Sequence, residues 1–296
     1  MANKLFVAQR TRRHVVKRLS AASMPATYDG TSFGTYTIPG TSVVALNFPW
    51  GCTVDAANYV FVCDTANHRI VKLDSSLVYD SHYDTTATVG TPYAIFYDAS
   101  TTDLYVVGID LATNNYLKIQ RLTTAFLSVK LSGNLNTIKD IWFKPTSICR
   151  GFLPNTILVS GANLDLFSTT ESGTFSSFVQ VPIVGETTTY PDLYATTQYF
   201  GMTQHSDGNL YLNNGRKILK VNSSYVNIGD SDVISKTLWG LRESAIDNSL
   251  LIYNVDDMKI QRYDTDLNFV EDVYANSGSS IGTSAYDIMD FAELSV

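Results

Sequence analysis

The chain has 296 residues, of which 45% are hydrophobic, 12% aromatic and 17% charged, and its formal net charge is -7 at pH 7. This composition can bury a large core and excludes an intrinsically disordered chain. Only five of the 28 acidic residues are Glu, and Tyr occurs 18 times. Because Tyr, Thr and Val favour strands and Asp favours turns, we expect an all-β protein.

No stretch approaches the about 18 consecutive apolar residues of a membrane helix, and the first 18 residues lack the apolar core of a secretory signal. We therefore expect no membrane span and no signal-peptide export. The three cysteines, Cys52, Cys63 and Cys149, show no spacing typical of zinc ligands and are interpreted as reduced core thiols.

The N-terminal segment is basic, with six Lys and Arg residues before the first acidic residue, Asp29. Hydrophobic groups at 5–8 and 15–16 bracket the charged residues 9–14, which predicts two short strands joined by a solvated turn. Because clustered Arg and Lys also attract phosphates, this turn is a candidate contact for an anionic partner.

The clearest repeated unit covers residues 48–81. It predicts a first strand with the aromatic-glycine pair Trp50-Gly51, further strands at 59–63, 69–73 and 77–79, and a polar turn at 64–68. Similar units begin at Tyr93, Thr146, Phe200 and Trp239. Their second strands recur every 41 to 53 residues, which is near the period of a β-propeller blade. Blade boundaries are least defined at 130–145 and 181–199.

The two ends supply a sixth blade. Residues 4–23 match the second and third strands of the unit, with Val7 aligned on Val62, whereas residues 284–294 resemble a first strand alone. The sequence therefore predicts one domain, residues 1–296, folded as a six-bladed β-propeller whose ring is closed by N-terminal strands pairing with the C-terminal strand. Such closure removes open sheet edges.

Residues 49–73, with Pro49-Trp50-Gly51 and the run from Asp64 through Asn67-His68-Arg69 to Leu73, resemble the NHL repeat. The resemblance covers about 35 residues of this unit. It implies a propeller of the kind used chiefly as a binding platform, with a minority of lyases and related lactonases. Trp50 and Trp239, at equivalent positions of two units, are interpreted as wedges between neighbouring sheets.

In a propeller, the turns between second and third strands surround the channel on one face. We predict binding residues there and no catalytic residue, metal ligand or cofactor. The predicted binding residues are Arg10, Arg12, Arg13, His14, Asp64, His68, Arg69, Asp110, Asn163, Asn214 and Asp256.

The function predicted from the sequence is a non-enzymatic protein-interaction or structural module in a multi-subunit assembly. Divergent repeats, few charges and abundant Ser, Thr, Asn and Tyr resemble virion structural proteins of tailed bacteriophages, in a capsid, neck or tail. The predicted location is the virion, or otherwise the cytoplasm. Two alternatives stay open: a calcium-dependent lactonase-like or esterase-like hydrolase, since turn carboxylates could bind calcium, and single-stranded RNA binding. We do not expect nucleic acid to be the main partner.

Overall fold

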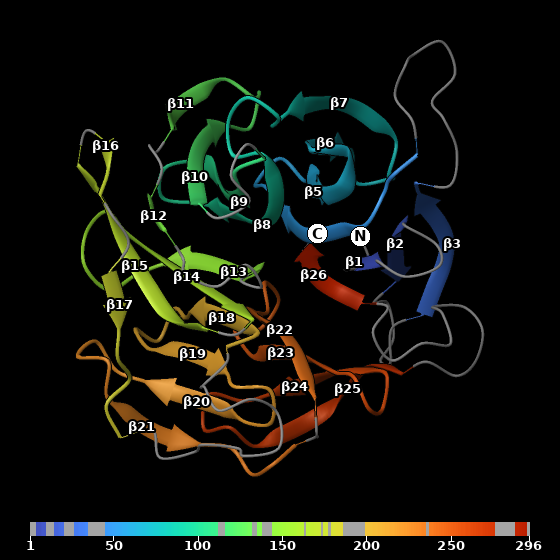
Figure 1. Cartoon of the computed structure of the whole chain (residues 1–296). Coiled ribbons are helices and arrows are strands. Elements are labelled where there is room, and N and C mark those ends of the chain that lie inside the picture. Colours follow the sequence, from blue (N-terminus) through green and yellow to red (C-terminus); the bar gives the residue numbers. More distant parts are fainter. Residues whose placement is uncertain are drawn as a thin grey trace.

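The structure is a computed structural model that describes residues 4–9, 15–20, 27–34, 45–111, 116–131, 135–137, 144–162, 164–172, 174–176, 179–185, 199–234, 237–275 and 288–294. The described strands form six antiparallel sheets, which surround one axis as blades (Figure 1). A 3-10 helix at Thr65–Asn67 accompanies them. The predicted all-β, six-bladed propeller is confirmed.

Five blades follow one another along the chain, and each runs from an innermost to an outermost strand. Blade 1 comprises β4 (Pro49–Val54), β5 (Val60–Asp64), β6 (Arg69–Leu73) and β7 (Tyr79–Asp84). Blade 2 comprises β8 (Thr91–Asp98), β9 (Asp103–Ile109), β10 (Tyr116–Thr123), β11 (Ser128–Leu131) and β12 (Leu135–Thr137). Blade 3 comprises β13 (Lys144–Arg150), β14 (Thr156–Ala162), β15 (Leu164–Ser172), β16 (Thr174–Phe175) and β17 (Val179–Val181). Blade 4 comprises β18 (Gly201–Gln204), β19 (Leu210–Asn213), β20 (Ile218–Val221) and β21 (Asn227–Asp230). Blade 5 comprises β22 (Leu238–Glu243), β23 (Leu250–Asn254), β24 (Lys259–Tyr263) and β25 (Phe269–Ala275).

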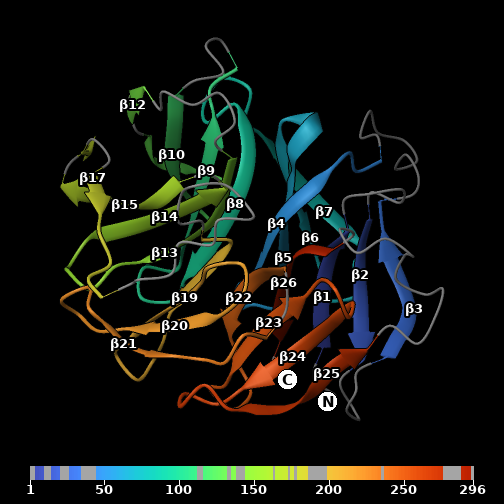
Figure 2. The same cartoon turned by 60° about the horizontal axis from the view of Figure 1, so that its bottom comes forward.

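The sixth blade joins the two ends of the chain. It comprises β26 (Ile288–Leu294), β1 (Lys4–Gln9), β2 (Val15–Ser20) and β3 (Thr27–Phe33), in that order from the axis outward. β1 and β26 lie side by side in both views (Figures 1 and 2), antiparallel, with Lys4 opposite Leu294 and Phe6 opposite Ala292. The predicted closure of the ring is thus confirmed.

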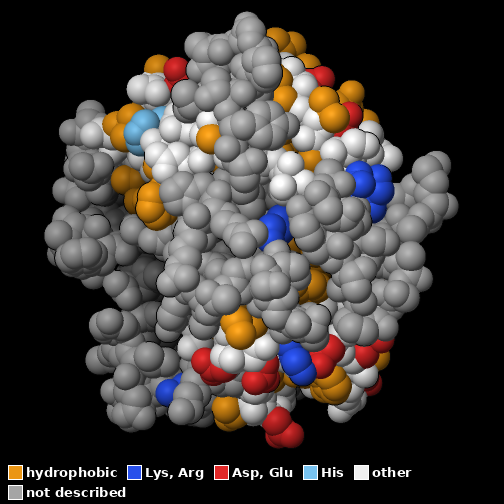
Figure 3. Space-filling model, turned by 90° about the vertical axis from the view of Figure 1, so that its right-hand side faces the viewer, with side chains coloured by type: hydrophobic (Ala, Val, Ile, Leu, Met, Phe, Trp, Pro, Cys, Tyr) orange, Lys and Arg blue, Asp and Glu red, His pale blue; other side chains and the backbone are white. Residues whose placement is uncertain are grey.

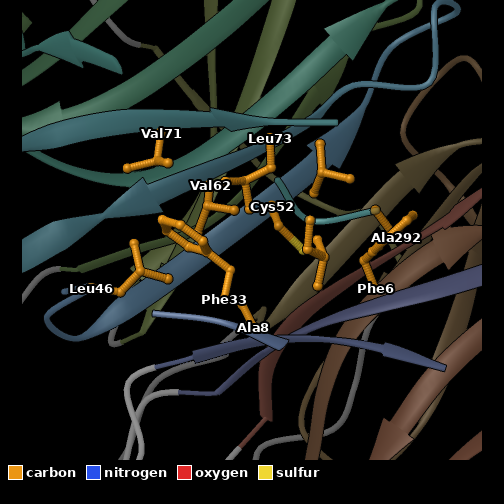
Figure 4. Packing of buried hydrophobic residues seen from close by; sticks show 11 residues of the cluster. Phe6, Ala8, Phe33, Leu46, Cys52, Val62, Val71, Leu73 and Ala292 are labelled. Atoms are coloured by element: carbon orange, nitrogen blue, oxygen red, sulfur yellow. The ribbon is translucent and has the colours of Figure 1, made fainter. Parts of the chain in front are cut away.

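The hydrophobic core lies in the seams between blades. Each sheet is covered on both faces by its neighbours, so both alternating sets of side chains in a strand are buried. The described residues form six buried clusters, one at each seam. Figure 4 shows the closing seam, where Phe6, Phe33 and Ala292 of the sixth blade face Cys52 and Val62 of blade 1.

The last strand of blade 1 lies further along the chain than predicted. The sequence indicated 77–79, whereas β7 spans Tyr79–Asp84. Leu77 instead belongs to the preceding turn, with a left-handed φ of 59° and a buried side chain. β7 alternates half-buried and exposed residues at the rim, so it lacks the apolar run that marks inner strands.

The segment after β17 links two blades. β17 pairs with β15 in blade 3, and Val184 then forms a parallel bridge to Val226 beside β21 of blade 4. Part of the stretch with undefined blade boundaries is therefore strand-like, and it covers the outer edge of blade 4. None of the described helices is long and apolar enough to cross a membrane.

Candidate functional site

The axial channel is lined by the innermost strands β4, β8, β13, β18, β22 and β26. We call the face with the turns between second and third strands the upper face, and the opposite one the lower face. Toward the upper face, five of these six strands carry a β-bulge in their pairing with the next strand. Such an extra residue bends the strand and re-aims a side chain.

Four aromatic side chains gather at this end of the innermost strands, three of them beside the bulges and Phe200 directly before β18. The rings of Trp50 and Tyr93 meet edge to face with centroids 5.2 Å apart, and those of Phe200 and Trp239 are 4.8 Å apart. Trp50 and Trp239 lie 6.5 Å apart and join the two pairs. We call these four residues the aromatic collar.

The collar extends the interpretation of the tryptophans as wedges between neighbouring sheets. Trp239 packs against the buried cluster between blades 5 and 6, as that interpretation predicts. Trp50 belongs to blade 1 and Trp239 to blade 5, and the sixth blade lies between these two. The contact between the two rings therefore reaches past the sixth blade and adds to the packing of Trp239 in its own seam. Because four large rings are in contact, the collar narrows the upper part of the channel.

Glycines allow the innermost strands to approach closely. A Cβ at Gly201 in β18 would lie 2.5 Å from the backbone of Gly240 in β22. At Gly51 in β4 it would lie 2.6 Å from the carbonyl oxygen of Tyr93 in β8. Side chains cannot occupy these contacts, so glycine fixes the diameter of the ring at this height.

One ion pair joins three blades below the collar. Arg242 in β22 donates from Nη2 to Asp290 Oδ2 in β26 at 2.6 Å, and its Nε lies 3.3 Å from Oδ1. The backbone N–H of Cys52 in β4 donates to the same Oδ2 at 3.1 Å, and that of Phe291 donates to Oδ1 at 2.9 Å. Asp290 thus links the C-terminal strand to both neighbouring blades.

The electrostatics of this pair reflect its depth in the ring. Burial raises the pKa of Asp290, although the Arg242 guanidinium opposes the shift. Burial disfavours the charge on Arg242, but Asp290 outweighs it, so the pKa of Arg242 is raised. The short Nη2–Oδ2 contact is that of a charge-assisted hydrogen bond.

A larger polar network joins blades 2 and 3 at the lower face. Arg150 of β13 binds Asp98 of β8 and lies 3.2 Å from the hydroxyl of Tyr105. That hydroxyl donates to Glu171 Oε2 at 2.8 Å, while Arg121 donates to Oε1 at 2.8 Å. The acidic and basic side chains of this network are in contact. Burial raises the pKa of Glu171, but hydrogen bonds from Arg121 and Lys130 outweigh burial, so the pKa is lowered. The network therefore links blades 2 and 3 structurally.

Of the predicted binding residues, Asp64 and Arg69 are buried and bound to each other at 2.7 Å. Asp64 also accepts hydrogen bonds from the backbone N–H of Asn47 and from the amide of Asn67. His68 follows in the left-handed region with φ 52°, and its Nδ1 lies 3.2 Å from Thr91 Oγ1. In blade 1 the NHL-like residues thus shape their own turn.

The other predicted binding residues are spread around the ring. Asp110 lies at the end of β9 with the Lys118 ammonium 3.3 Å away. Asn214 is buried, and its side-chain oxygen accepts from backbone N–H groups of its own turn. Asp256 is exposed. Arg10, Arg12, Arg13, His14 and Asn163 lie outside the described residues. The described members lie on one face, at turns of four different blades, and Asp64 and Arg69 are in contact with each other.

The sequence did not indicate Arg242 and Asp290 as partners, because 48 positions separate them and only ring closure joins them. Within the described residues, no three His, Cys, Asp or Glu side chains are grouped as metal ligands. The cysteines Cys52, Cys63 and Cys149 are buried and free, as predicted, and burial raises the pKa of each thiol.

Comparison with known proteins supports the fold. The family profile described as NHL repeat matches residues 46–73, the first three strands of blade 1. No curated protein is significantly similar to the chain.

Solved structures resemble the whole ring. A chain of a nidogen/laminin complex has a TM-score of 0.65 at 10% identity and covers 98% of both chains. A catalytically inactive virginiamycin B lyase from Staphylococcus aureus with quinupristin has a TM-score of 0.59 at 14% identity, covering 100% of this chain and 96% of that one. A gluconolactonase from Xanthomonas campestris has a TM-score of 0.55 at 13% identity, covering 86% and 84%. At these identities the similarity shows a shared fold alone.

Proposed function

We propose that the protein is a non-enzymatic binding platform that docks other proteins on its lower face. The observation that carries this proposal is a set of exposed apolar side chains at the lower-face turns. They are Val78, Leu127, Leu153 and Phe269, exposed by 60%, 67%, 67% and 53%. They come from blades 1, 2, 3 and 5, so they recur around the face and suit a protein partner better than a small ligand.

The turns that carry these residues are held in place. In the turns of blades 1, 2 and 5, Leu77, Phe126 and Leu267 adopt left-handed φ angles of 59°, 63° and 69°. Leu77 and Leu267 are buried, and Phe126 packs against the core cluster between blades 1 and 2. Burial of a large apolar side chain offsets the cost of an unfavourable backbone angle. Pre-ordered turns lose little entropy on binding a partner.

The narrower assignment places the protein in a multi-subunit assembly, namely the capsid, neck or tail of a bacteriophage virion. It rests on composition, and neither the family match nor the structural neighbours bear on it. One of the structural neighbours is a chain of a nidogen/laminin complex, which supports a docking role for this kind of ring.

Site-specific photocrosslinking in the native host tests the proposal. A photoreactive residue replaces Leu127 on the lower face or, as a control, Val233, which is 58% exposed in the connection from blade 4 to blade 5 on the upper face. We expect a discrete protein adduct from position 127 that is absent from position 233. Adducts of equal yield at both positions, or none, would contradict the proposal.

A second candidate is an enzyme, which the lyase and gluconolactonase neighbours favour at the level of fold. Carboxylates of the upper-face turns, Asp110 and Asp256 among them, would then hold calcium. Turnover of a lactone or ester that chelation abolishes, and that Asp110→Asn or Asp256→Asn reduces, would establish this candidate. Inertness toward a broad panel would favour the binding platform.

RNA binding has less support. Arg69, one of the basic residues among the predicted binding residues, is bound by Asp64. Figure 3 shows the ring from the side. Asp and Glu side chains gather there at the bottom of the picture, over blade 5. A nucleic-acid surface requires a broad positive footprint. Affinity for single-stranded RNA that falls steeply with salt would support this function nonetheless.

A further inference from the structure

We infer that the lower-face turn of blade 4, residues 205–209, is a pH-sensitive switch whose capping side chain is His205. Protonation of His205 removes the hydrogen bond that caps this turn and changes the conformation of the turn. The inference concerns the folding of one turn, so it holds whether or not a partner binds the lower face as proposed above.

The first step is the hydrogen bonding of the His205 imidazole. Its Nε2 lies 2.5 Å from the carbonyl oxygen of Asn248 in blade 5, and its Nδ1 lies 3.0 Å from the backbone nitrogen of Asp207. A carbonyl oxygen only accepts and a backbone N–H only donates, so Nε2 carries the hydrogen and Nδ1 is the acceptor. Both ring nitrogens are therefore used, and this pattern requires the neutral imidazole.

The second step is the position of His205 in the repeat, because the same turn follows the first strand of other blades. In blade 1 the backbone N–H of Ala57 donates to Asp55 Oδ1, two residues before it, at 2.9 Å. The Asp207 N–H makes the equivalent bond to His205. Two further blades have this bond, from Ser100 N–H to Asp98 Oδ1 at 3.0 Å and from Ile246 N–H to Ser244 Oγ at 3.2 Å. His205 therefore takes the capping position that a carboxylate or a hydroxyl fills in three other blades.

The third step is the chemistry of the cap. Carboxylate and hydroxyl oxygens accept hydrogen bonds throughout the range from about pH 5 to 8, whereas imidazole is the side chain that changes its charge there. A protonated imidazole carries a hydrogen on each nitrogen and accepts none. The Asp207 N–H would then face the Nδ1–H across 3.0 Å, so the two groups must separate. Of the four caps, the cap of blade 4 is thus the one that mild acid removes.

Two carboxylates lie beside the ring and would receive the hydrogens of its protonated form. Asp207 Oδ1 is 3.1 Å from Nδ1, and Glu243 Oε1 in β22 is 3.6 Å from Nε2. Asp207 Oδ1 already accepts from the backbone N–H of Asn209 at 2.9 Å, so a new bond to Nδ1 alters the whole turn. The other ionisable groups on this side are Tyr211 and Lys220 of blade 4, which contact Asp207, and in blade 5 Asp247 with its partner Arg262, Asp264 and Asp266.

The turn has room to change its conformation. Ser206, Asp207 and Gly208 are exposed at the lower face. A Cβ at Gly208, whose φ is 86°, would have no neighbour within 4 Å among the described residues. His205 itself is buried, with 3% of its side chain accessible, and is bound to Asn248 across the seam to blade 5. A proton taken up inside the seam therefore acts on residues at the surface.

NMR on the whole 15N-labelled chain tests the inference. At about pH 7.5 we expect a scalar coupling between the Asp207 amide nitrogen and His205 Nδ1 across their hydrogen bond. As the imidazole takes up its proton, this coupling should disappear. Exchange of the Asp207 amide with water should then rise by about tenfold or more relative to that of Ala57, which makes the same bond to a carboxylate.

Three results would overturn the inference. The first is an imidazole whose hydrogen is on Nδ1 at about pH 7.5. The second is an imidazole that stays neutral down to about pH 5 in the folded protein. The third is an exchange ratio between Asp207 and Ala57 that stays constant while His205 titrates.

Substitution at position 205 separates the cap from the rest of the turn. His205→Asp introduces the carboxylate of blades 1 and 2, and His205→Ser introduces the hydroxyl of blade 5. Both variants should keep the Asp207 amide protected and lose its pH dependence. His82→Ala, in the exposed part of β7, is the matched control and should respond as wild type. A pH dependence equal to that of wild type in the position 205 variants would contradict the inference, and the wild-type titration decides alone if they do not fold.

Discussion

Substitution of Asp290 by Ala isolates the contribution of the ion pair that holds the closing strand. It leaves Arg242 deep in the ring without its counter-charge, and it removes the acceptor of the Cys52 N–H. Loss of one partner from a buried pair costs about 3–5 kcal/mol. We place this case near the lower limit, at about 3 kcal/mol, because the Arg242 side chain keeps 16% of its surface accessible. The unpaired N–H adds about 1 kcal/mol.

The total of about 4 kcal/mol is a large part of the about 5–15 kcal/mol that stabilises a typical protein. Equilibrium unfolding in urea, followed by tryptophan fluorescence, measures the change, and an unchanged m-value would show that the unfolded state is not affected. Asp80→Ala is the control, since Asp80 pairs with Lys72 at 3.8 Å at the exposed rim. That variant should cost less than about 1 kcal/mol.

The double variant Arg242→Met/Asp290→Leu separates the pair from its surroundings. Apolar residues of similar size remove the uncompensated charge, so the double variant should be clearly more stable than Asp290→Ala. Two results would show that the pair does not hold the ring as described. One is a cost of less than about 1 kcal/mol for Asp290→Ala. The other is a loss of stability in the double variant that exceeds the summed losses of Arg242→Met and Asp290→Leu.

Three further outcomes follow from the structure. Gly201→Ala should cost about 2–4 kcal/mol in urea unfolding because its Cβ would strike the backbone of Gly240, whereas Gly229→Ala, with its nearest neighbour at 3.9 Å, should cost less than about 1 kcal/mol; equal costs would contradict the close packing of β18 and β22. Asp64→Ala should destabilise by about 3 kcal/mol because it removes the carboxylate that is bound to the buried Arg69 guanidinium, and a loss of partner binding without a loss of stability would instead favour the predicted role of Asp64 in a binding site. Burial opposes ionisation of Asp207, but hydrogen bonds, led by those from Asn209, outweigh it and lower the pKa of Asp207 to about 2. Because Asp207 is exposed and solvent screens it, its contribution to stability is at most on the order of 1 kcal/mol; it is present above pH 3.8 and lost as the pH falls toward 2. Asp207→Asn should flatten stability over this range, and an unchanged pH profile would refute the assignment.

The inner strands were predictable because they are covered on both faces. The runs at 59–63 and 69–73 are apolar enough to mark β5 and β6 of blade 1, and the equivalent pattern in residues 4–20 located β1 and β2. The outer strand β7 was misplaced because its polar alternation resembles a loop. The apolar sequence of an inner strand is enough to predict it. An outer strand lacks such a pattern, because it forms by pairing with the edge of a sheet that is already present.

The axial features could not be predicted from local patterns. The β-bulge beside Trp50 interrupts the pairing of β4 with β5, and the partner of Arg242 lies 48 positions away on the closing strand. Asp64 was assigned to a binding face from its turn position, whereas its carboxylate is used by Arg69 and by the backbone of Asn47. Sequence spacing shows that such residues share a face, but it does not show which of their atoms are already bound.

The account depends on closure of the ring by the two ends of the chain, and a disulfide tests it directly. Lys4 and Leu294 are opposite each other in β1 and β26, and the native cysteines are buried. In the variant Lys4→Cys/Leu294→Cys, mild oxidation should give an intramolecular disulfide in monomeric protein and raise the midpoint of unfolding. Free thiols, or disulfide-linked dimers in place of the closed monomer, would contradict the shared sheet and with it the six-bladed ring.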